Sequence, residues 1–151
     1  MKGEWEKRWQ AHQHERVYFT YAPTPHKSHI DAHSDRKKAL SSIVVQMKTG
    51  KIGLDSYLHG IRPEEAPSDR CRGYLTDRET VCHVLLDCVA CRAQRRRYWK
   101  DGIPNGLRET FTDAGKTITA ARLILSLALL NQYSRTNRKT LSAIEGKQDQ
   151  Q

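Results

Sequence analysis

Residues 71–91 read CRGYLTDRETVCHVLLDCVAC, and this stretch decides how the rest of the chain is interpreted. It holds all four cysteines of the protein (Cys71, Cys82, Cys88 and Cys91), and His83 lies among them. A disulfide framework in a secreted protein usually spreads its cysteines so that they join distant segments. A tight cluster beside a histidine is instead typical of a metal site in an intracellular protein. We therefore take residues 71–91 as the candidate site.

The overall charge points to an anionic partner. The chain has 151 residues with 26 Lys and Arg against 17 Asp and Glu, a formal net charge of +9. This surplus favours nucleic acid as the partner, although ordinary solubility charge is an alternative. There is no long apolar run to span a membrane, and the charged start MKGEWEKRW does not resemble a secretory signal. We expect an intracellular protein, nuclear or cytoplasmic, that is neither secreted nor in contact with a membrane.

Apolar periodicity on both sides of the cysteines predicts a small, mostly α-helical domain over residues 35–133. Leu40, Ile43, Val44 and Met47 fall on one face of a helix that ends near Gly50, and a short helix follows around Leu54. Residues 80–100 read as mostly helical. Residues 117–133 predict a helix that is buried on most sides. Residues 1–34 form a separate N-terminal segment, and residues 134–151 a polar, frayed C-terminal tail.

One run of the chain resembles a known family. The run begins at Thr49-Gly50-Lys51-Ile52-Gly53-Leu54 and continues through Ser68-Asp69-Arg70-Cys71, Arg78-Glu79-Thr80-Val81 and His83-Val84-Leu85-Leu86-Asp87-Cys88. It resembles the C-terminal region of fungal non-LTR (LINE-type) retrotransposon polyproteins, downstream of the reverse transcriptase and RNase H domains. The resemblance extends over about residues 5–133. It implies that residues 1–34 follow the position of a lost RNase H domain.

The resemblance implies a CCHC-type zinc-knuckle-like segment of the form C-x-C, a gap, then H-x4-C, which binds nucleic acid. Cys71 takes the first Cys position, His83 the His position and Cys88 the last Cys position. Gly73 stands where the family has its second Cys, and Val89 stands where a proline commonly follows. The motif is therefore degenerate, and it lacks one ligand.

The chemistry of zinc leaves two candidates for the missing ligand. A structural zinc ion takes four nitrogen or sulfur ligands in a tetrahedron. Cys91 is the better candidate, because Cys88 and Cys91 at i, i+3 on a helix can converge on one ion. Cys82 is adjacent to His83 and points in another direction. The alternative to zinc is that these are small buried thiols left in a decayed site.

Arginines follow the cysteines directly. Arg92, Arg95 and Arg96 lie at i, i+3, i+4, so that they share a helix face, and with Arg97 they predict contacts with nucleic-acid phosphates. Tyr98 and Trp99 come next, either as stacking platforms for bases or as core residues. The alternative for the arginines is a solvated basic face.

The sequence contains no recognisable catalytic motif: the carboxylate motifs of the family's RNase H and polymerase domains are missing, as are phosphate-binding loops. We expect a nucleic-acid-binding, non-catalytic fragment of a reverse transcriptase polyprotein. The alternative is a metal-free structural or protein-interaction remnant of the retroelement. Other parts of the parent polyprotein are then candidate partners. An enzyme would require carboxylates that cluster only in three dimensions.

Overall fold

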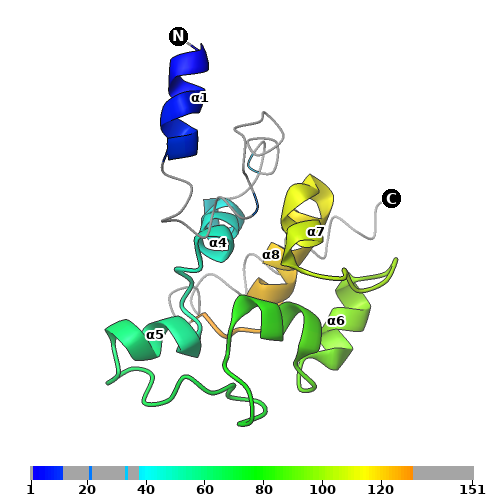
Figure 1. Cartoon of the computed structure of the whole chain (residues 1–151). Coiled ribbons are helices and arrows are strands. Elements are labelled where there is room, and N and C mark those ends of the chain that lie inside the picture. Colours follow the sequence, from blue (N-terminus) through cyan, green and yellow to red (C-terminus); the bar gives the residue numbers. More distant parts are fainter. Residues whose placement is uncertain (1, 12–20, 22–32, 34–37, 131–151) are drawn as a thin grey trace.

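The computed structural model describes residues 2–11, 21, 33 and 38–130 (Figure 1). The elements are α1 (Lys2–Ala11), α4 (Lys38–Thr49), α5 (Asp55–Ile61), the π-helix η2 (His83–Asp87), α6 (Arg92–Tyr98), α7 (Leu107–Thr112) and α8 (Ala114–Ser126). The described residues form no β-strand, only one isolated antiparallel bridge between Arg70 and Arg78. The predicted mostly α-helical fold is confirmed.

Helix α8 is the central element of the described fold. Its side chains are small or apolar on most sides, and it packs against α4, α6, α7 and η2. Asp113 caps its N-terminus, because the carboxylate accepts a hydrogen bond of 2.7 Å from the backbone N–H of Lys116. The helix ends at Ser126, earlier than the predicted end at 133. Just beyond, Ala128 adopts a left-handed conformation with φ of 53°, which no α-helix accommodates.

The amphipathic pattern of the first predicted core helix is confirmed in α4. The predicted residues Leu40, Ile43, Val44 and Met47 are all buried. Gly50 follows the helix with φ of 70°, a conformation that favours glycine and closes the helix. Hence this part of the fold follows from local sequence, and the buried stripe of α4 lies against α8.

The cysteine segment (residues 71–91) combines an exposed loop at residues 72–78 with side chains that are part of the core. Cys71, Cys88 and Cys91 belong to the same buried cluster as the large apolar side chains of α4, η2, α7 and α8. The ring of Tyr21 meets Phe111 edge to face, with the centroids 4.9 Å apart, at another side of this core. A change at the cysteines therefore affects the stability of the whole domain.

Residues 80–100 are mostly helical, as predicted, but the helix is interrupted and does not run through the whole range. The backbone N–H of Cys88 reaches back to the carbonyl of His83 at 2.7 Å and closes the π-helix η2. Cys88 then leaves helical geometry, with ψ of 120°. The chain turns through residues 88–91 before α6 begins at Arg92. No glycine or proline marks this break in the sequence.

The two ends of the chain lie mostly outside the described residues. Within the predicted N-terminal segment 1–34 only α1, Tyr21 and His33 are described, and the predicted tail 134–151 is not described at all. In the described ranges, no helix has both the length and the apolar character that a bilayer span requires.

Candidate metal centre

Three side chains of the kinds that bind metals converge in the core. Cys71 follows the bridge residue Arg70, His83 is the first residue of η2, and Cys88 comes directly after η2. One ligand atom from each lies within 4.8 Å of the other two, and all three residues are buried. We call Cys71, His83 and Cys88 the Cys–His cluster. This cluster has the donor atoms and the geometry to hold a metal ion.

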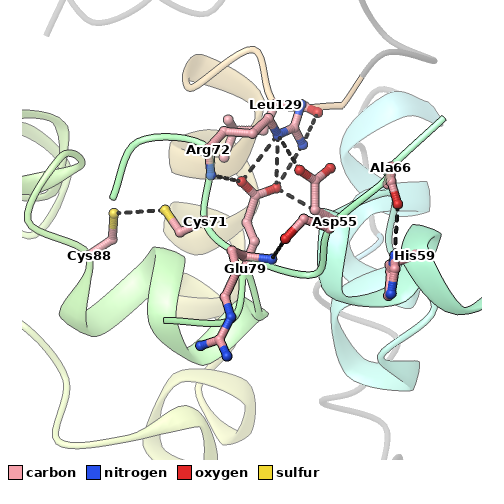
Figure 2. Close-up of polar contacts among 10 residues, drawn as sticks. Asp55, His59, Ala66, Cys71, Arg72, Glu79, Cys88 and Leu129 are labelled. Carbon is pink, nitrogen blue, oxygen red and sulfur yellow. Dashed lines mark hydrogen bonds and ion pairs between the residues drawn. The ribbon is translucent and has the colours of Figure 1, made fainter. Parts of the chain in front are cut away.

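The two sulfurs of the cluster have the spacing of metal-bound thiolates. Cys71 Sγ and Cys88 Sγ are 3.6 Å apart, which is far longer than the 2.05 Å of a disulfide. Figure 2 draws this contact as a dashed line between the two sulfurs. Two thiolates bound at about 2.3 Å to a tetrahedral ion lie about 3.8 Å from each other. The same separation also allows a thiol–thiol hydrogen bond, so that the pair is satisfied without an ion as well.

The surroundings of the Cys71 sulfur affect the pKa of its thiol in both directions. Burial raises the pKa of the thiol, and so does its neighbour Cys88. Against this, the nearby backbone amides of Gly73 and Tyr74 lower the pKa. The net direction in the metal-free protein is upward. A cation bound at the sulfur would offset the burial and favour the thiolate.

His83 leaves one ring nitrogen without a partner. Its Nδ1 lies 4.0 Å from a carboxylate oxygen of Asp77. Its Nε2 is buried and has no hydrogen-bond partner within the described part of the chain. A carboxylate beside one nitrogen, with the other nitrogen directed at an ion, is the usual arrangement of a metal-bound histidine. A buried nitrogen without a partner is otherwise costly, so Nε2 is a candidate ligand atom for an ion.

Cys91 supplies a third sulfur beside the cluster. The residue is buried, and burial together with the thiols of Cys88 and Cys71 raises its pKa to about 12, while the Arg95 cation acts in the opposite direction. Cys91 therefore neighbours Cys88, but it is not one of the three residues whose ligand atoms converge, and the predicted helical arrangement of Cys88 and Cys91 is wrong. Cys88 and Cys91 are joined by a turn, in which the N–H of Cys91 donates to the carbonyl of Cys88 at 3.2 Å, and not by a helix.

The remaining thiol lies apart from the cluster. Cys82 is exposed, whereas its neighbour His83 is buried, because adjacent residues of a helix point in different directions. The sequence argument that favoured Cys91 over Cys82 agrees with this placement.

Gly73 has no space for a side chain. A Cβ at this position would lie 2.6 Å from the Cβ of Ala90, so that the turn after Cys71 and the turn between Cys88 and Cys91 are in direct contact. The position at which the resembled family has its second cysteine is therefore closed in this chain. A fourth ligand has to come from elsewhere, and Cys91 lies at the far end of the turn that holds Ala90.

A buried ion-pair network holds the Cys71 loop in place, and the sequence analysis missed it. The Glu79 carboxylate is 1% exposed and accepts hydrogen bonds from the backbone N–H groups of Asp55 and Arg72 and from the Arg72 guanidinium. Figure 2 shows Arg72 between Glu79, Asp55 and the carbonyl of Leu129. The network joins the residue next to Cys71 to α5 and to the segment after α8. Its only trace in the sequence is that Glu79 belongs to the run that carries the family resemblance.

The pKa values of two ionisable groups in this network, one acidic and one basic, are shifted from their ordinary values. Burial and the negative charge of Glu79 raise the pKa of Asp55, although Arg72 opposes them. Burial alone would lower the pKa of Arg72, but the hydrogen bonds and charge of Glu79 outweigh it and raise that pKa. Arg72 is therefore held as a cation between two carboxylates.

The four predicted nucleic-acid-binding arginines do not share one exposed face. Arg92, Arg96 and Arg97 are exposed on α6, but Arg95 is 4% exposed and donates from Nη1 to the carbonyl of Cys88. The expectation that Arg95 presents its guanidinium to phosphates is wrong, because its side chain points into the core. Trp99 is also buried, with its Nε1 near the carbonyl of Leu85 at 3.4 Å, so it packs in the core and not against bases.

Comparison of the chain with protein-family models, with curated proteins and with solved structures finds no match. The resemblance to the retrotransposon polyproteins thus stays a prediction from the sequence.

Proposed function

We propose that this chain is a nucleic-acid-binding module built around a structural zinc ion, without catalytic activity of its own. Cys71, His83, Cys88 and Cys91 would hold the ion. The observation that carries the proposal is the meeting of two sulfurs at 3.6 Å with a buried histidine whose Nε2 has no partner among the described residues. In this role the chain would be the C-terminal fragment of a retrotransposon polyprotein, a proposal that rests on the sequence resemblance alone.

Zinc is the ion that suits these donor atoms. Thiolate sulfur with imidazole nitrogen is a soft ligand set, and a set of three Cys and one His is common in structural zinc sites. All four candidate ligands are buried protein groups. Such a closed site leaves no position for a substrate or a reactive water. The proposed ion would therefore stabilise the fold and present the neighbouring surface.

The surface beside the cluster supports nucleic acid as the partner. Helix α6 starts directly after Cys91 and carries the exposed Arg92, Arg96 and Arg97, which can engage phosphates. On the two turns that meet at Gly73 and Ala90, the apolar side chains of Tyr74, Leu75 and Val89 are 51%, 76% and 53% exposed. Exposed aromatic and aliphatic groups next to arginines are typical of surfaces that bind unpaired bases. We therefore propose a single-stranded nucleic acid as the ligand.

The zinc part of the proposal is tested by elemental analysis of protein purified without chelator. We expect one zinc ion per chain in the wild type, loss of zinc together with thermal stability in Cys88→Ser, and no loss in the matched variant Cys82→Ser. A folded wild-type protein without zinc, which also takes none up on addition, would refute the metal centre. The interaction-remnant alternative would then be favoured.

The nucleic-acid part is tested by the anisotropy of a labelled single-stranded RNA or DNA oligonucleotide at several salt concentrations. We compare the triple variant Arg92→Gln/Arg96→Gln/Arg97→Gln with a control of equal charge change, Arg8→Gln/Lys51→Gln/Arg108→Gln, whose residues are exposed elsewhere. If the α6 arginines contact three phosphates, the slope of log affinity against log salt falls by about 2 in the first variant only. Equal effects of both variants would indicate that net charge, and not this surface, binds the oligonucleotide.

A further inference from the structure

The guanidinium of Arg95 is buried beside the Cys–His cluster. The residue lies one helical turn after Cys91, and its backbone N–H donates to the Cys91 carbonyl at 2.9 Å. Its side chain is directed inward, where Nη1 donates to the carbonyl of Cys88. Arg95 therefore donates hydrogen bonds to the carbonyls of Cys88 and Cys91, the first and last residues of the turn between η2 and α6.

Arg95 lacks the partner that a buried cation normally has. It forms no ion pair with any carboxylate in the described part of the chain, and its Nε is buried without a hydrogen-bond partner there. Burying a charge without a counter-ion is strongly unfavourable, and a backbone carbonyl offsets only part of the cost. The groups near Arg95 that become anionic are sulfurs, since its cation acts electrostatically on the thiol of Cys91.

The charges balance in the metal-bound site but not in the metal-free site with all thiols protonated. Three protonated thiols and a neutral imidazole carry no charge, so that Arg95 would be an uncompensated positive charge in the core. Three thiolates (−3) around a divalent ion (+2) carry a net charge of −1. Together with the guanidinium (+1), the sum is zero.

We propose that Arg95 is the built-in counter-ion of a three-thiolate metal centre, and that it positions and neutralises the site without binding the ion itself. The inference rests on the proposed metal centre, and it adds to that centre a residue that does not bind the ion. It also separates the buried Arg95 from Arg92, Arg96 and Arg97, which are exposed on α6. A second consequence is that Arg95 favours metal sites with three sulfurs over sites with two, because only three give the charge that it balances.

The test compares Arg95→Met, Arg95→Lys and the exposed neighbour Arg96→Met in the full chain. Cobalt(II) replaces zinc as a probe, because its tetrahedral thiolate complexes absorb visible light, and a chelator in competition gives the affinity. We expect Arg95→Met to bind cobalt about 10- to 100-fold more weakly than the wild type, as for other residues that support metal ligands. Arg95→Lys keeps the charge and should recover most of the affinity, and Arg96→Met should bind as the wild type does.

The stability of the metal-free protein supplies the second measurement. If Arg95 is a counter-ion, urea unfolding of metal-free Arg95→Met has a midpoint equal to or above that of the wild type, because an uncompensated buried charge has been removed. If Arg95 is simply a packing residue, Arg95→Met loses stability in the metal-free state, and Arg95→Lys does not restore cobalt affinity. That result, or unchanged cobalt affinity in Arg95→Met, would overturn the inference. A wild-type protein that binds no cobalt would instead remove the metal centre and the inference with it.

Discussion

The hydrogen bonds of Glu79 give the most quantitative prediction, because they connect the loop after Cys71 to the rest of the domain. The carboxylate is almost fully buried and accepts from Asp55 N at 3.1 Å, from Arg72 N at 3.0 Å and from the Arg72 guanidinium at 2.7 Å. Glu79→Ala removes all of these bonds in a single step. Glu79→Gln keeps the volume and one acceptor, but it loses the charge.

The expected cost of Glu79→Ala follows from the groups that it leaves behind. Two partly buried backbone N–H groups lose their acceptor, at about 1 kcal/mol each, and a charged hydrogen bond worth about 1.5 kcal/mol or more is lost. Arg72 adds little to the loss of stability, because its side chain is 36% exposed and keeps its ion pair with Asp55 at 3.3 Å. We therefore expect Glu79→Ala to lower the free energy of unfolding by about 3–4 kcal/mol. Glu79→Gln should lower it by about half as much, since its amide offers a donor where an acceptor is needed.

Urea denaturation of the metal-free protein measures this change. The matched control is Glu65→Ala, which removes an exposed ion pair with Arg62 at 2.9 Å and should change stability by less than about 1 kcal/mol. A double-mutant cycle with Arg72→Ala isolates the pair itself. A loss of less than about 1 kcal/mol in Glu79→Ala would show that water replaces the carboxylate, and the argument from burial would fail.

Four further predictions concern the cluster and the core. In the metal-free protein the pKa of the Cys91 thiol is raised to about 12, and the stability that this shift contributes is fully present below about pH 9. Above that pH the thiol loses its proton in the unfolded chain before it does so in the folded protein, so the free energy of unfolding falls by about 1.4 kcal/mol per pH unit toward pH 12. Urea titrations at several pH values measure this slope, and Cys91→Ser should remove it. Gly73→Ala should destabilise the fold by about 1–3 kcal/mol through its clash with Ala90, and Ala90→Gly in the same chain should restore the melting temperature; if it does not, the contact at 2.6 Å is not the cause. Leu123→Ala in the centre of α8 should cost about 2–5 kcal/mol in urea unfolding, and a smaller loss would mean that the core around α8 closes over the cavity. Cys82→Ser should leave both cobalt affinity and stability within error of the wild type, because this thiol is exposed and outside the cluster.

Local patterns were enough to predict the helices with one apolar face. Helix α4 buries the four residues that its periodicity indicates, and α8 buries the small and apolar side chains of the predicted core helix. The reason is that a helix repeats every 3.6 residues, so that residues on one face can be found from their spacing. The charge pattern at the start of α8 is equally local, since Asp113 caps the helix three residues before the N–H that it binds.

The break between η2 and α6 could not be predicted from local sequence. Residues 80–100 have helical composition throughout, and no residue in the turn from Cys88 to Cys91 requires a break. The chain leaves the helix there and places Cys88 and Cys91 in the core, and Cys88 lies next to His83 and Cys71. Tertiary packing outweighs the local propensity of these residues, which differs by only tenths of a kcal/mol between helix and turn.

The arginines of α6 also show what sequence spacing alone does not predict. Arg92, Arg95 and Arg96 have the spacing of a shared face, but the face toward the core is occupied by Arg95 and the others point to solvent. Sequence spacing states which residues lie together on a helix. It does not state which side of that helix the rest of the protein covers.

The sequence by itself determined the helical class, the buried face of α4, the apolar character of the central helix and the residue types available for a metal, because each of these depends on neighbours a few positions apart. Only the tertiary structure decided that Cys71 meets His83 and Cys88, that Gly73 lies against Ala90, that Glu79 holds Arg72 and that Arg95 is buried. Each of these depends on a distance between segments far apart in the chain, or on which face is desolvated. Both are set by the packing of the whole core and leave no periodic signal in the sequence.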